Sequence, residues 1–186
     1  MRITGTVPTN LTGSLLVALP TLLDRNFRRT ILFLVKHEPS EGAMGVILNR
    51  PTAYRLPDLD ESVPEGLENV PVFEGGPVEK HQLILARMIV AEATTRFETL
   101  DREIGDPFAN LSQGELRAFV GYAGWTSGQL EREIAEKSWI TLPPTPELLT
   151  ASASDEEGAV LWRSIMKRLG PMYHLMALAP DDPGLN

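Results

Sequence analysis

The chain of 186 residues contains no cysteine, which excludes disulfides, thiolate nucleophiles and zinc sites built on sulfur. It also lacks long hydrophobic runs: the longest, at residues 15–20 and 31–35, fall far short of the roughly 20 residues of a membrane helix. The first residues show no charged region followed by an apolar one, as a signal peptide would. We therefore expect a cytoplasmic protein with no membrane segment.

Basic residues are few relative to acidic ones. Lys and Arg number 17 against 25 Asp and Glu, a net charge of −8. Because general nucleic-acid binding needs a basic face that displaces counterions from phosphates, we do not expect direct nucleic-acid binding. The one basic patch with an aromatic residue, Arg25, Arg28 and Arg29 around Phe27, is expected to be a solvated or acid-pairing surface instead.

Several catalytic and cofactor motifs are missing from the sequence. It contains no phosphate loop of the form GxxxxGK[ST], no GxGxxG opening a helix and no GxSxG around a serine. Its three histidines are far apart and form no HExxH pair. We therefore expect no metal ion and no cofactor, and a binding protein rather than an enzyme.

The composition present is that of a single globular domain spanning residues 1–186, with 42% hydrophobic residues. Residues 1–12 are expected to be a mobile lead-in, and residues 52–70 a surface loop with one helical turn. Capping residues and a 3.6-residue apolar period predict a helix over 154–169. Short apolar or alternating runs predict strands at 13–19, 30–36, 44–48, 70–73, 81–89, 116–122, 139–142 and 172–178, the second and third forming an antiparallel hairpin. For 116–122 the alternative is a helix, because Ser112 and Glu115 have the spacing of a capping box.

Three segments combine glycine with polar side chains beyond what packing alone requires. Asn49 and Arg50 stand at a strand end, where they bind a ligand or cap a turn. Gly75 and Gly76 permit a close approach of a ligand or of another strand. Residues 121–131 predict a strand, a glycine-rich turn and a helix start.

The turn at 124–128 has two interpretations. Its free N–H groups could hold an anion, and Arg50 could join it in a small-molecule or hydrolase-like site with Glu131 or His37 as general base. Alternatively, Thr126 and Gln129 form a capping box and the segment is structural.

In this order, the motifs NRP at 49–51, GGPV at 75–78 and GYAGW-x-x-GQLE at 121–131 resemble the YqgE/AlgH family of bacterial proteins. The resemblance extends from about residue 11 to residue 186. It implies an α+β fold whose bent or bifurcated, mostly antiparallel sheet forms a partial barrel with flanking helices. The family carries the label of transcriptional regulator and transfers no catalytic residue.

The resemblance and the missing motifs together favour a non-enzymatic binding or regulatory protein that acts on transcription indirectly, through a protein partner. The alternative is the anion-binding enzyme described above. The candidate binding surface consists of Asn49, Arg50, Gly75, Gly76, Tyr122, Gly124, Trp125, Ser127, Gln129 and Glu131.

Overall fold

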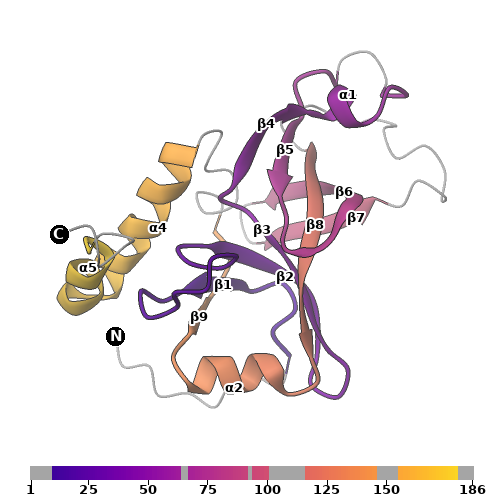
Figure 1. Ribbon diagram of the computed structural model, residues 1–186. Helices are drawn as coiled ribbons and strands as arrows, with labels where there is room; N and C mark the ends of the chain where they lie inside the picture. The colour runs from indigo at the N-terminus through magenta and orange to yellow at the C-terminus, as the bar shows by residue number, and fades with distance from the viewer. Residues whose placement is uncertain (1–9, 64–66, 92–93, 101–115, 146–154, 180–186) are drawn as a thin grey trace.

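The computed structural model describes residues 10–63, 67–91, 94–100, 116–145 and 155–179 (Figure 1). These residues form nine strands and four helices. The strands are β1 (Leu15–Ala18), β2 (Ile31–Glu38), β3 (Gly42–Ile47), β4 (Pro51–Arg55), β5 (Pro71–Glu74), β6 (Val78–Ala91), β7 (Thr94–Leu100), β8 (Leu116–Thr126) and β9 (Trp139–Leu142). The helices are α1 (Leu56–Leu59), α2 (Gln129–Ala135), α4 (Asp155–Leu169) and α5 (Pro171–Ala177).

The long strand β8 is the point at which the sheet divides. On one edge, residues 123–126 of β8 pair antiparallel with β3, whereas residues 118–120 pair in parallel with β5. On its other edge β8 pairs with β6, which pairs with β7. The sheet curls into a half-barrel whose upper and lower parts both contain β8 (Figure 1). The α+β fold with a bent, mostly antiparallel sheet is confirmed.

The strand β1 is buried on both faces, which explains why its sequence is continuously apolar. Leu15 and Val17 pack in the cluster that also contains Trp162, Ile165 and Met166 of α4. The alternate residues Leu16 and Ala18 pack in a second cluster, with side chains of α2 and β9. The Trp162 indole N–H also donates to the Ala18 carbonyl at 2.8 Å, so α4 is fixed on the sheet as well as packed against it.

Two of the predicted elements are wrong. Residues 172–178 were expected to form a strand, but residues 171–177 form α5, because Pro171 takes the first helical position, where its missing N–H costs nothing. Residues 51–55, expected in part as loop, form β4; Pro51 is its first residue, a position that tolerates proline.

The expected mobile lead-in is wrong for the residues that the structure describes. Leu11 is 1% exposed, and its backbone N–H donates to Nδ1 of His37 at 3.0 Å. Gly13 and Ser14 continue along β2 through backbone hydrogen bonds with Leu34. Ser154, the first residue of the helix predicted over 154–169, lies outside the described residues. No helix among the described residues is long and apolar enough to span a membrane.

Candidate functional site

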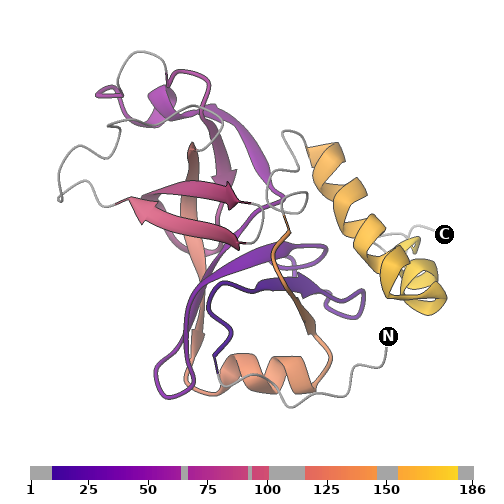
Figure 2. The same cartoon turned by 180° about the vertical axis from the view of Figure 1, so that it is seen from behind.

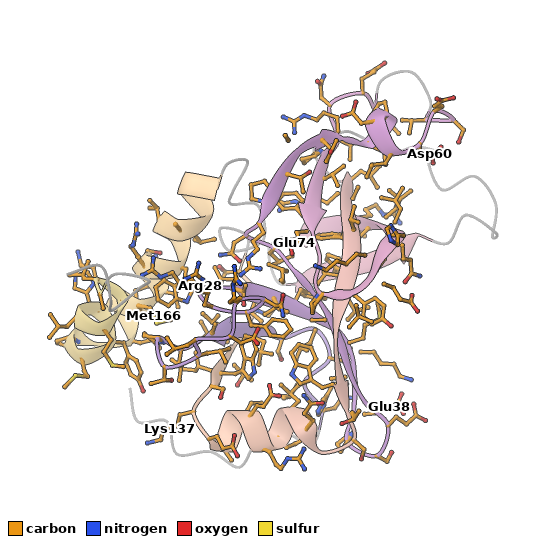
Figure 3. The ribbon with its side chains drawn as sticks, in the orientation of Figure 1. Arg28, Glu38, Asp60, Glu74, Lys137 and Met166 are labelled. Carbon is orange, nitrogen blue, oxygen red and sulfur yellow. The ribbon has the colours of Figure 1, made fainter. Side chains whose placement is uncertain are left out.

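The connection between β1 and β2 is residues 19–30, and its part from residue 20 to residue 30, which carries the basic patch, is called the arginine loop below. Its tip is a single turn organised by Asp24, whose carbonyl accepts the N–H groups of Phe27 at 3.0 Å and Arg28 at 2.8 Å. The Asp24 carboxylate accepts the Asn26 N–H at 2.8 Å. Asp commonly starts a turn in this way. Figure 3 shows Arg28 on the side of the sheet where α4 lies.

The Arg50 side chain binds the backbone of the arginine loop. Nη1 donates to the Asn26 carbonyl at 2.8 Å, and Nη2 donates to the carbonyls of Arg28 at 3.3 Å and Arg25 at 3.4 Å. A planar guanidinium suits this task because its donors diverge in one fixed plane. These carbonyls would otherwise need water or another donor.

Asn49 holds the end of the same loop. Its Oδ1 accepts the N–H of Ile31 at 2.8 Å, and its Nδ2 donates to the carbonyls of Arg29 at 2.9 Å and Gly158 at 3.3 Å. The side chain is 6% exposed, so the amide is used on the protein's own backbone. The contact needs a glycine at position 158, because a Cβ there would overlap the carbonyl oxygen of Asn49.

Arg29 adopts a left-handed backbone with φ of 58°. This conformation costs a residue with a Cβ about 1–2 kcal/mol. The Arg29 guanidinium donates to the Ala179 carbonyl at 2.8 Å and lies 5.5 Å from the Trp162 ring centroid. These contacts and the Asn49 bond stabilise a conformation that the residue alone would not adopt, which is a common property of functional loops.

Phe27 packs the loop against what we call the tryptophan cluster: Phe27, Trp125, Trp139 and Glu133. The Phe27 ring centroid lies 6.2 Å from Trp125 and 5.6 Å from Trp139. Both indole N–H groups donate to Oε2 of Glu133, at 2.9 and 2.7 Å, and Gln129 donates to Oε1 at 2.9 Å.

Gly75 and Gly76 lie at the place where the sheet divides. A Cβ on Gly75 would overlap the carbonyl oxygen of Gly121, and one on Gly76 would overlap the backbone of Tyr122. The Gly75 carbonyl accepts the N–H of Ile47 at 2.9 Å, so the ends of β3 and β5 and the middle of β8 meet there. These glycines allow the strand backbones to approach each other closely where they cross.

The turn after β8 differs from the predicted one. Strand β8 continues through Gly124 and Trp125, so the turn itself contains only Ser127 and Gly128. The expected capping box is half present: Gln129 Oε1 accepts the Thr126 N–H at 3.0 Å, while the N-cap of α2 is Gly128 and makes no side-chain bond. Ser127 donates to the Pro39 carbonyl.

Glu131 pairs with a buried histidine. Its Oε1 lies 2.9 Å from Nε2 of His37, which is 1% exposed. Because Nδ1 of His37 accepts the Leu11 N–H, the proton of the neutral ring sits on Nε2 and is donated to Glu131. The pair fastens the segment before β1 to α2.

The structure brings together part of the predicted site. Asn49 and Arg50 contact the arginine loop directly, Trp125 reaches it through Phe27, and Gln129 joins Trp125 through Glu133. It does not bring Arg50 to the turn at 124–128, because that turn lies beside Gly42 at the opposite end of β3, a strand length of roughly 17 Å away. In the described part of the chain, no three His, Asp or Glu side chains are grouped to hold a metal ion.

Sequence reasoning missed Glu133, Trp139 and the role of the loop. The spacing of Gln129 and Glu133, four residues apart on a helix, was the available signal for Glu133. Nothing in the local sequence indicates that Phe27 lies between two tryptophans about a hundred residues away.

Comparison with known proteins gives concordant results. A family model described as AlgH-like matches residues 15–174. A UPF0301 protein of Streptomyces avermitilis is 35% identical over 191 residues, covering 95% of this chain and 96% of its own, and one of Stutzerimonas stutzeri is 37% identical, covering 78% and 83%.

Two solved structures are also similar. The solution structure of the AlgH protein from Pseudomonas aeruginosa has a TM-score of 0.63 and 26% identity, covering 96% of this chain and 98% of that one. The crystal structure of a protein from Corynebacterium diphtheriae has a TM-score of 0.68 and 22% identity, covering 96% and 95%, and supports the fold alone. The chain belongs to the AlgH-like family.

Proposed function

We propose that this protein is a non-enzymatic, cytoplasmic binding protein that acts on transcription indirectly, by contacting a protein partner through the arginine loop. The observation that carries the proposal is the backbone of that loop, four of whose carbonyls, from Arg25 to Arg29, accept hydrogen bonds from the side chains of Asn49 and Arg50. Motif residues that could have formed a surface instead support a neighbouring loop.

The loop presents side chains outward from this fixed backbone. Leu23 is 74% exposed, and Arg25 is also exposed. A loop held in its binding conformation loses little conformational entropy when it binds, which favours affinity. Binding residues are commonly found on loops supported by a rigid sheet.

The residue types in the loop favour a protein partner. An exposed leucine next to arginines offers an apolar contact together with directional donors for carboxylates, and arginine is frequent at interface hot spots. A polyanion such as nucleic acid would be repelled by the rest of a chain of net charge −8. The transcriptional label of the family is then explained by contact with another protein.

The test is capture of partners from an extract of cells that make the protein, with the tagged chain and three variants. Arg25→Glu reverses a charge on the loop and Arg50→Ala releases its backbone. Arg132→Glu reverses an exposed charge on α2 and is the control. We expect a discrete protein to bind the parent and the control and to be lost with both loop variants. Equal capture by all four proteins would contradict the proposal.

A further inference from the structure

We propose that the buried pair of His37 and Glu131 is a pH-sensitive switch, which holds residues 10–12 in place when the imidazole is neutral and releases them when it is protonated. The His37 ring is 1% exposed and uses both of its nitrogens. Nδ1 accepts the Leu11 N–H at 3.0 Å, and Nε2 lies 2.9 Å from Oε1 of Glu131. Histidine is the side chain that ordinarily changes its charge between about pH 5 and pH 8. The switch does not require the partner of the arginine loop.

A β-bulge directs His37 toward α2. The pairing of β2 with β3 shifts register between Leu34 and Lys36, and such a shift reverses the alternation of side chains along the strand. Leu34 packs in the second cluster, and so does Ala43, which lies opposite His37 on β3. Without the bulge Lys36 would face that cluster, but its side chain is 56% exposed and His37 faces the cluster instead.

Glu131 is the charged group of α2 that faces the imidazole. Its side chain is 32% exposed, so a proton can reach the pair from solvent although the ring is buried. Residues 10–14 and Ala43, which also surround the ring, have no titratable side chain. The other charged side chains on these elements are bound elsewhere: Glu133 by the two indoles, and Lys36 by Glu38 at 3.3 Å and Glu41 at 2.8 Å.

Protonation changes the hydrogen bonds that the ring can make. Both nitrogens of an imidazolium are donors. Nε2 keeps its bond to Glu131, which becomes an ion pair, but the new Nδ1–H would face the Leu11 N–H across the 3.0 Å that now joins donor and acceptor. A buried N–H without an acceptor is unfavourable. Leu11 therefore separates from the ring, while the ring stays bound to α2.

The segment that is released is short and contains a buried leucine. The Gly13 N–H donates to the Leu34 carbonyl at 2.8 Å, a bond that does not involve the His37 ring, so release ends there. Leu11 is 1% exposed and packs in the second cluster, which contains both indoles of the tryptophan cluster. Figures 1 and 2 both show the indigo start of the described chain beside α2. Release therefore uncovers apolar surface next to the tryptophan cluster.

The experiment measures amide hydrogen exchange of the full chain at about pH 7.5 and about pH 5, expressed as protection factors so that the intrinsic effect of pH is removed. We expect Leu11 to lose about tenfold or more in protection at the lower pH. Gly13, and Phe119 in the buried part of β8, should keep theirs. The ¹⁵N resonances of the His37 ring should show a neutral ring protonated on Nε2 at the higher pH and an imidazolium at the lower.

Three variants separate the ring from the rest of the chain. His37→Asn keeps an acceptor for the Leu11 N–H but cannot titrate, so Leu11 should be equally protected at both pH values. Glu131→Gln keeps an acceptor for Nε2 but removes the opposite charge, so the midpoint of the Leu11 transition should fall by about one pH unit or more. This second variant also serves if His37→Asn does not fold. His81→Asn replaces an exposed histidine of β6 and, as the control, should behave as the parent does.

Three results would overturn the switch. The first is a His37 ring with the same charge at both pH values, and the second is a ring that becomes charged while Leu11 keeps its protection. The third is a Leu11 transition that persists in His37→Asn or keeps its midpoint in Glu131→Gln, because another group would then control it. Loss of protection at Phe119 together with Leu11 would mean that acid unfolds the whole protein, and would contradict a local release as well.

Discussion

Arg50 donates from Nη1 to the carbonyl oxygen of Asn26 across 2.8 Å, linking the end of β3 to the tip of a loop 24 residues earlier in the chain. The same guanidinium also binds the carbonyls of Arg25 and Arg28. A residue whose type favours carboxylate or phosphate recognition is thus used to shape a neighbouring loop. The exposed arginines, Arg25 and Arg28, belong to that loop.

Replacing Arg50 should loosen the arginine loop without unfolding the protein. Arg50→Ala leaves three carbonyls without their donor, and we expect it to lower the free energy of unfolding by about 1–3 kcal/mol. Arg50→Lys should recover only part of this loss, because an ammonium cannot span three acceptors in one plane. Urea unfolding measures the energies, and amide hydrogen exchange of residues 25–29 should accelerate. Arg132→Ala, on exposed α2, is the control; the account is wrong if exchange in the loop is unchanged.

Glu133 should stabilise the tryptophan cluster through its charge. Glu133→Gln provides one carbonyl oxygen in place of two carboxylate oxygens, so its NH₂ must face either the two indole N–H groups or the Gln129 amide. We expect a loss of about 2–3 kcal/mol and shifts in the indole proton resonances of Trp125 and Trp139. Glu136→Gln, at the exposed end of α2, should change neither. A Glu133 variant as stable as the parent would show that the three hydrogen bonds contribute nothing.

The strand crossing at Gly75 should not tolerate a methyl group. Gly75→Ala would push a Cβ into the carbonyl oxygen of Gly121, with the Phe119 Cβ also close at 3.1 Å, and should cost about 3 kcal/mol. Gly128→Ala meets nothing within 4 Å but has φ of 69°, so it should cost only about 1 kcal/mol. Thermal unfolding compares the two. A Gly75→Ala variant that loses no more stability than Gly128→Ala would contradict the close approach of strands at Gly75.

Arg117 should destabilise the native state at neutral pH. Burial lowers the pKa of Arg117 to about 10, so the side chain is still charged at neutral pH, and its Nη1 has no hydrogen-bond partner. Its guanidinium lies 5.0 Å from the Phe73 ring centroid, and this contact offsets part of the free-energy cost of burying the charge. Arg117→Met should therefore raise the free energy of unfolding by about 1 kcal/mol.

The pH dependence of this difference has a definite sign. Because the folded pKa of Arg117 is below its unfolded value, the native state releases the proton first as the pH rises through about 10. The parent then gains stability relative to Arg117→Met, so the difference between their free energies of unfolding should become smaller. Urea unfolding at neutral and alkaline pH measures this. A variant less stable than the parent at neutral pH would show that the guanidinium is compensated in the native state.

Local sequence patterns predicted most of the sheet, because strands such as β2 and β8 show their type through alternating or continuous apolar residues. The helix α4 was equally predictable from its apolar stripe. The helix α5 was not predicted, since its seven mostly apolar residues fit either a strand or a helix. Only the pair Gly170–Pro171 indicates that a helix starts there. The motifs at Asn49 and Arg50 were recognised as special, but their role depends on carbonyls in another segment, which local patterns do not indicate.

The most direct measurement is amide hydrogen exchange of the full chain with and without the captured partner protein. The account predicts slower exchange in residues 21–29 on binding, with little change in α1. Slower exchange confined to β4 and α1, with the arginine loop unaffected, would contradict it.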